Sequence, residues 1–399
     1  MTSSHASLGK KIWSESRINQ EKKSIKDELE ALPLKERLPY ILKLASVSAQ
    51  STEPEAQVRR FIYSISALLH HEKYGGLSTS QVWGLAQVTQ TILQTNRIRP
   101  VSSKLCFLYG EIHLALSHIF RKEGKHDEAT WEQLLSEHLS RSRQIGGPSF
   151  SSFLKALRFM RLGDASSALR EYERAENVEP HSQFFERSRI GRIRALRLSG
   201  KIEDASKLIH ETRKLFRGNT PEAQELEWEM ICVEFQKNGN PVPFFATTRP
   251  KSSHYQAVYV VEAFFWAHSI ECRAWERNFS KISSLLKNKT LKISNLGFFH
   301  HCALDLEKCY DTDVPLLTRL EIASKCLAKR SKLLAIDREL LLLAAMTRWL
   351  MRSKALDLAE VTLNNYRALS LRLSSGKKED ALGVLGNVMT KFSDGKFKV

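Results

Sequence analysis

The chain has 399 residues, of which 42% are apolar and 26% charged, and its net charge is +17. This composition excludes a disordered or fibrous protein and is typical of a globular one. The positive excess leaves two interpretations open: an acidic partner, or a charge dispersed over a large surface.

The six cysteines are scattered without any CxxC pair. This predicts free thiols in a reducing compartment rather than a disulfide framework. The first residues lack the apolar stretch of a secretory signal. The longest apolar run, Leu340–Met346, is far shorter than the roughly 20 residues that span a bilayer. We therefore expect a cytoplasmic protein without a membrane span.

The N-terminal part divides into two predicted regions. Residues 1–30 are polar and rich in charge, so they are expected to be largely flexible, with a solvated helix possible beyond Ser14. Residues 31–102 are expected to form a helical cap, because apolar side chains recur there every three or four residues. Pro33 and Pro39 punctuate a short helix predicted at 34–44.

A glycine followed five residues later by an alanine recurs at nearly equal intervals in the next part of the chain. Glycine ends a helix in the left-handed conformation at low cost, and a small alanine lets two helices approach closely. Self-similarity of this kind indicates a stack of helical hairpins. The pairs are Gly124 with Ala129, Gly163 with Ala168, and Gly200 with Ala205.

The middle copy resembles the tetratricopeptide repeat family. Its matching positions are Ala156, Phe159, Gly163, Ala168, Tyr172, Ala175 and Pro180. Only Ser152 departs, where the family has a tryptophan-like residue. The first copy departs at Gln133 and Ser136, and the third at Ile193, Thr212 and Arg217. The resemblance covers about residues 111–217 and implies a right-handed α-solenoid.

The predicted fold is therefore all-α: a right-handed α-solenoid of helical hairpins with helical caps. The repeats are expected over residues 103–238. Pro241 and Pro243 predict an irregular loop at 239–253, since proline removes a backbone donor. Residues 254–399 are expected to be a helical region of degenerate repeats. Its last three predicted helices are 336–352, 356–373 and 378–391.

In the repeat family, the first helix of each hairpin lines a concave groove. Carried over by position, the resemblance implies an apolar strip flanked by arginines that binds a partner segment. Its residues are Phe150, Phe153, Leu157, Met160, Arg187, Arg194 and Arg197, and the first copy adds His118, Arg121 and Lys122. The alternative is a solvated charged face above core aromatics.

The function expected from this pattern is a protein–protein interaction scaffold or adaptor that binds a protein or peptide partner in the groove, where an acidic segment would suit the arginines. An alternative is a regulator that contacts nucleic acid or another polyanion through its basic surface, where residues 187–201 are rich in arginine. Against it, these arginines spread around the helix, and no stacking aromatics interleave with them.

Catalytic residues, metal sites and cofactors are not predicted, because no catalytic or nucleotide-binding motif occurs in the sequence. We therefore expect a protein that is not an enzyme. The one metal-like cluster is His300, His301 and Cys302 with Asp305 and Cys309. Its spacing matches no recognised zinc site, and buried thiols with surface histidines explain it better.

Overall fold

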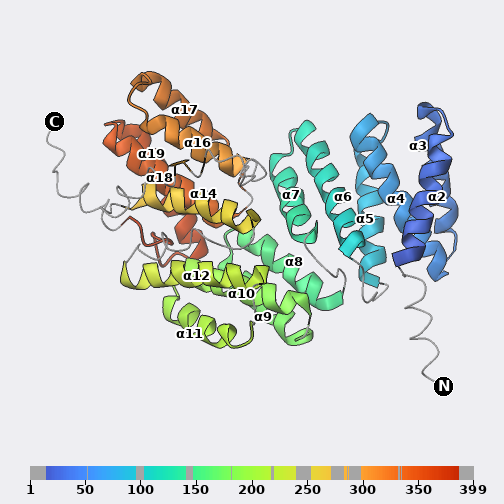
Figure 1. Ribbon diagram of the computed structural model, residues 1–399, viewed down its shortest axis with the longest axis horizontal. Helices are drawn as coiled ribbons and strands as arrows, with labels where there is room; N and C mark the ends of the chain where they lie inside the picture. The colour runs from blue at the N-terminus through green and yellow to red at the C-terminus, as the bar shows by residue number, and fades with distance from the viewer. Residues whose placement is uncertain are drawn as a thin grey trace. The chain divides into compact units, whose positions relative to one another are not determined.

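The computed structural model describes residues 15–51, 53–95, 103–140, 147–180, 182–216, 220–239, 253–270, 283–284, 286, 298–330, 333 and 335–385. Within these ranges the chain forms sixteen α-helices and no strand (Figure 1), which confirms the all-α prediction. The chain divides into two compact units. The first comprises Met1–Leu154 with His181–Gln183, and the second comprises Lys155–Pro180 with Phe184–Val399. The right-handed solenoid stays a prediction.

The first unit is built around one buried helix. Its helices are α2 (Glu15–Glu30), α3 (Leu34–Ala49), α4 (Pro54–Tyr74), α5 (Thr79–Thr95), α6 (Ser103–Lys122), α7 (His126–Ser140) and the first turns of α8 (Gly147–Arg161). Helix α4 packs against α2, α3, α5 and α6. Its Phe61, Ile62, Ile65 and Leu68 are at most 1% exposed. Their spacing of three and four residues gives the face that forms this core.

One N-terminal expectation needs adjustment, whereas the helix left open beyond Ser14 is present. Helix α3 continues through Pro39 to Ala49, beyond the predicted end at 44, because Ile41 and Ala45 share a face that is buried. Residues 15–30 form α2, whose Ile25 is buried. The rest of the segment expected to be flexible, residues 1–14, lies outside the described residues.

The second unit is organised around α18 (Ile336–Arg352). Almost every residue of this helix is buried, as expected for a helix that is apolar on most sides. It packs against α14, α16 and α19. The other helices are the end of α8, α9 (Ala165–Val178), α10 (Gln183–Leu198), α11 (Ile202–Arg213), α12 (Pro221–Asn238), α14 (Ser253–Ser269), α16 (Phe298–Tyr310), α17 (Leu316–Ala328) and α19 (Leu356–Leu373).

The predicted hairpin turns are present. At Gly163, φ is +79°, its N–H donates to Met160 O at 3.0 Å, and the next N–H donates to Phe159 O at 2.9 Å. The turns at Gly124 and Gly200 have the same pattern, and the alanines that follow all three glycines are buried. The glycine–alanine spacing therefore identified these turns correctly.

A fourth turn of this kind contains lysine in place of glycine. Lys354 has φ +59°, and its N–H donates to Met351 O at 3.1 Å. The N–H of Ala355 donates to Leu350 O at 3.0 Å, and Ala359 is completely buried five residues after the lysine. Helices α18 and α19 thus form a hairpin with the same turn as the predicted repeats.

The helix predicted at 378–391 is absent from the described residues, where 374–385 form turns and bends. The Asp380 carboxylate accepts hydrogen bonds from the Tyr366 hydroxyl and from the N–H groups of Val384 and Leu385. These bonds hold the backbone in a compact turn instead of a helix. The loop expected at 239–253 falls largely outside the described residues.

Among the described helices, none is both long and apolar enough to cross a membrane.

Candidate interaction site

The apolar strip predicted on α8 belongs to the interior. Phe150 and Phe153 are each 2% exposed, Met160 is 7% exposed and Leu157 is 9% exposed. The Phe153 ring lies edge-on to the His138 ring of α7, with centroids 5.6 Å apart. The prediction that this strip faces solvent is wrong, because the positions that suggested a groove are used for packing.

The predicted arginines lie on α10, where glutamates pair with them. Arg187 Nε is 3.4 Å from Glu222 Oε1. Arg194 contacts two carboxylates of α12, with Nη2 2.9 Å from Glu225 Oε1 and Nε 2.5 Å from Glu229 Oε1. Each arginine is therefore neutralised within the chain.

Arg197 is the most deeply buried of these cations. Its Nε donates to Glu229 Oε2 at 2.8 Å, and its side chain is only 3% exposed. The side chain of Arg194 is 26% exposed. Arg197 therefore does not line an open groove as expected, and Arg194 is only partly exposed. Burying a guanidinium requires a carboxylate partner, and α12 provides it.

The N-terminal turn of α18 completes this network of charges. Three consecutive residues of that turn reach three different helices, α10, α14 and α8. The pairs are Asp337 with Arg194 at 3.6 Å, Arg338 with Glu262 at 3.5 Å, and Glu339 with Arg161 at 3.4 Å. The side of α10 that was expected to receive a partner segment is therefore occupied by the chain's own α18.

Burial controls the charge state of the carboxylates in this network. It raises the pKa of Glu262 to about 7, although the nearby Arg338 opposes the shift. Burial also acts to raise the pKa of Asp337, but Arg194 and the other arginines hold it below its ordinary value. Trp228 Nε1 donates to Glu262 Oε2 at 2.5 Å. The network holds α18 in place, and burial shifts the pKa of Glu262 toward neutral pH.

The histidine and cysteine cluster lies on α16. In the part of the chain that the structure describes, no three His, Cys, Asp or Glu side chains are grouped to hold a metal ion. Cys302 and Cys309 are completely buried, as expected. His300 is only 9% exposed, so this histidine is buried and the expectation that it lies at the surface is wrong. Burial raises the pKa of Cys309 to about 12, which keeps this thiol protonated and unreactive at neutral pH.

An aromatic side chain remains accessible in the first unit. Trp83 of α5 is 39% exposed, and its ring packs on the buried Phe120 of α6 with centroids 4.9 Å apart. Lys125 Nζ lies 5.8 Å from the centroid of the same Phe120 ring. An indole held in this way offers a rigid apolar contact beside a cation.

Helix α6 also carries three basic side chains that are exposed or half-exposed. His118 is 42% exposed, with Nδ1 3.3 Å from Glu72 Oε1. Arg121 donates to Gln133 Oε1 at 2.9 Å, and Lys122 is exposed beside it. Within the described residues, neither Arg121 nor Lys122 pairs with a carboxylate. We call Trp83, His118, Arg121, Lys122 and Lys125 the Trp83 surface.

The sequence identified part of this surface. His118, Arg121 and Lys122 were expected as binding residues of the first repeat copy, and the structure leaves them accessible. Trp83 and Lys125 were missed, since only the packing of α5 on α6 brings Trp83 onto Phe120.

No family model, curated protein or solved structure matches this chain.

Proposed function

We propose that this chain is a non-catalytic interaction scaffold or adaptor built from helical hairpins like those of tetratricopeptide repeats. In this proposal it binds an acidic segment of a partner protein at the Trp83 surface. The observation that carries the proposal is the exposed indole of Trp83, which packs on Phe120, the ring that Lys125 also approaches. Tryptophan and arginine are the side chains that most often dominate the energy of protein interfaces.

The location follows from what the other candidate face already contacts. Arg194 and Arg197 of α10 pair with Glu229 of α12, and Arg194 also reaches Asp337 of α18, so both arginines have intramolecular partners. By contrast, Arg121 and Lys122 have no carboxylate partner in the described part of the first unit. A partner's carboxylates would pair with Arg121 and Lys122 without breaking an existing ion pair of the chain.

The two kinds of side chain have different roles. The exposed part of Trp83 provides affinity when it leaves water against an apolar side chain of the partner. Arg121 and Lys122 attract the acidic segment and set its register, so their contribution falls as salt screens it. Lys125 is already paired with Glu123 at 2.9 Å.

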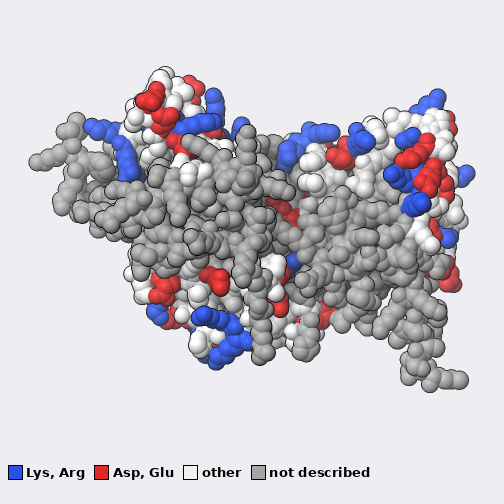
Figure 2. All heavy atoms as spheres, in the orientation of Figure 1, with Lys and Arg blue, Asp and Glu red and all other residues white. Residues whose placement is uncertain are grey.

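The same charges favour a protein partner over a nucleic acid. Arg187, Arg189, Arg192, Arg194 and Arg197 of α10 all pair with glutamates. Basic and acidic side chains are interspersed over the described surface that is visible in Figure 2. The arginine-rich run that suggested a polyanion therefore presents little excess positive charge.

A peptide-display selection on the full chain tests the proposal. The expected motif is an apolar residue flanked by aspartate or glutamate. Enriched peptides should bind Trp83→Ala and the double variant Arg121→Glu with Lys122→Glu at least about tenfold more weakly, a loss of roughly 1.4 kcal/mol. Thermal melts establish that each variant is folded.

The matched control changes exposed residues of the second unit, Leu317→Ala with Lys329→Glu. This control should keep the parent affinity. Enrichment of basic peptides, or equal binding by parent and Trp83 variants, would rule out the proposed surface.

A further inference from the structure

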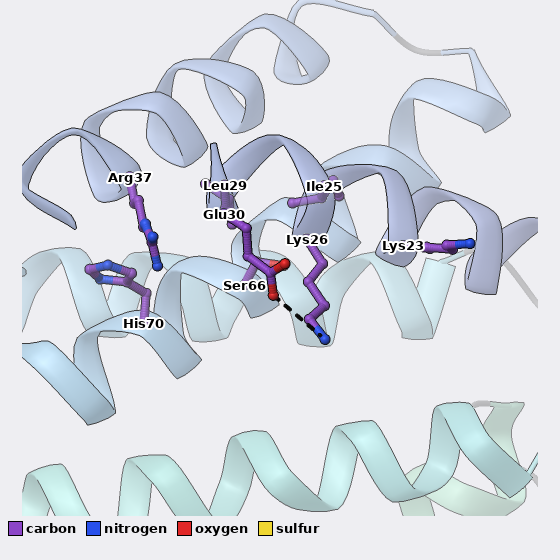
Figure 3. A pocket seen from close by; sticks show the side chains of 8 residues that line it. All are labelled: Lys23, Ile25, Lys26, Leu29, Glu30, Arg37, Ser66 and His70. Carbon is purple, nitrogen blue, oxygen red and sulfur yellow. Dashed lines mark ion pairs between the residues drawn. The ribbon is translucent and has the colours of Figure 1, made fainter. Parts of the chain in front are cut away.

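The first unit contains a second feature, a cavity of about 400 Å³ formed by α2, α3 and α4 (Figure 3). Ile25 and Leu29 of α2 contribute apolar side chains, and Ile25 is 4% exposed. Arg37 of α3 and His70 of α4 contribute polar groups. This volume lies within the range of small-molecule sites, about 300–1,000 Å³.

The charges in the cavity are not balanced. Lys26 Nζ is 3.6 Å from Glu30 Oε1, so these two cancel. Arg37 Nε donates a hydrogen bond to Leu32 O at 2.9 Å. Within the described residues, no carboxylate pairs with the Arg37 guanidinium. Lys23 also lines the cavity, but its side chain points away from the others in Figure 3. The net positive charge is therefore concentrated at Arg37.

His70 lies beside Arg37, as Figure 3 shows. Both ring nitrogens of His70 are shielded from solvent and make no hydrogen bond within the described part of the chain. A shielded polar atom without a partner costs free energy that a ligand can recover. Burial, and then Arg37 and His71, lower the pKa of His70. The ring is therefore neutral at pH 7 and has one N–H to donate.

We propose that this cavity binds a small organic carboxylate with an apolar body. The Arg37 guanidinium and the His70 N–H both donate to carboxylate oxygens, and a guanidinium matches a carboxylate in geometry. Ile25 and Leu29 receive the apolar body. An amine would be repelled by Arg37. Residues 1–14 contain no aspartate or glutamate, so their side chains have no carboxylate to place there.

Calorimetric titration of the full chain with 4-phenylbutyrate tests this proposal, with the neutral 4-phenylbutyramide as the matched probe. The carboxylate should bind at least about tenfold more tightly than the amide, as expected for a charge-assisted hydrogen bond. Arg37→Gln should remove that advantage. Lys35→Gln removes an exposed positive charge from the same helix and should leave the affinity unchanged.

His70→Phe keeps a ring of similar size without its nitrogens. It should weaken binding of the carboxylate but not of the amide. If Arg37→Gln melts at a lower temperature than the parent, His70→Phe takes its place as the test of the carboxylate site. Absence of binding by 4-phenylbutyrate at millimolar concentration would overturn the proposal. Equal affinity for both probes, or full affinity in both variants, would do the same.

Discussion

Arg197 and Glu229 form a buried ion pair, with Nε to Oε2 at 2.8 Å and side chains 3% and 1% exposed. The second oxygen of the same carboxylate lies 2.5 Å from Arg194 Nε. Arg194 in turn reaches Asp337 of α18. One carboxylate of α12 thus joins two arginines of α10, and the network extends to the central helix of the second unit.

Removing one member of this pair should destabilise the protein. Arg197→Met leaves Glu229 buried with only Arg194 as a partner, and breaking a buried ion pair costs about 3–5 kcal/mol. Urea unfolding followed by circular dichroism measures the change. Lys207→Met, at an exposed position of α11, is the control and should shift stability by less than about 0.5 kcal/mol. Equal midpoints for the two variants would show that the arginine is not buried as described.

A pair of glycines tests the packing of α9 on α10. A Cβ atom at Gly191 would overlap the ring of Tyr172, which is 2% exposed, whereas one at Gly84 would meet nothing within 4 Å. Gly191→Ala should therefore destabilise the protein by about 1–3 kcal/mol through overpacking. Gly84→Ala should stabilise it by up to about 1 kcal/mol, because alanine favours the helix. Thermal melts that move in the same direction would contradict this contact.

Glu262 should make stability depend on pH. Its pKa rises from 4.5 to about 7 on folding, so the folded chain binds this proton more tightly than the unfolded chain. The contribution is fully present below about pH 4.5 and is lost as pH rises through 7. The free energy of unfolding of the parent, minus that of Glu262→Gln, should fall over this window by on the order of 1–3 kcal/mol.

The comparison with Glu262→Gln is necessary because His268 acts in the opposite direction. Burial lowers the pKa of His268 to about 3, so its contribution is lost as pH falls below the ordinary value of 6.5. Both proteins contain His268, and its effect cancels in the difference. A difference that does not change between pH 4.5 and 8 would mean that Glu262 titrates normally.

The turn at Lys354 predicts a stabilising substitution. Lysine at φ +59° pays a steric cost that glycine avoids. Relief of this strain in Lys354→Gly should therefore raise the free energy of unfolding by up to about 1 kcal/mol. The backbone entropy that glycine loses on folding reduces this gain. The exposed mid-helix change Glu360→Gly of α19 is the control and should lower stability by about 1 kcal/mol. A lower melting temperature for Lys354→Gly would contradict the left-handed conformation.

Features set by local geometry were predictable from the sequence. The bounds of α18 and α19 agree with the predicted ranges, because each helix is one continuous segment with helical apolar spacing. Glycine identified the turns at Gly124, Gly163 and Gly200. The turn at Lys354 was missed because the left-handed residue there is not glycine, although the buried alanine follows at the same distance.

Features set by distant contacts were not predictable. Whether Arg194 faces solvent depends on Glu229 and on Asp337, and the position of α18 beside α10 cannot be read from local periodicity. The strip that begins at Phe150 has the same spacing whether it packs inside or binds a partner. Trp83 gives no local signal of the surface it forms with Lys125.

Helix α18 is the buried centre of the second unit, and amide hydrogen exchange measures this burial directly. Peptides from Ile336–Met351 should exchange slowest, at a rate set by global unfolding, because nearly all their side chains are buried. Peptides from α17, where Leu316 and Leu317 are 45% and 72% exposed, should exchange much faster. Exchange of α18 as fast as that of α17 would contradict the burial of α18 at the centre of this unit.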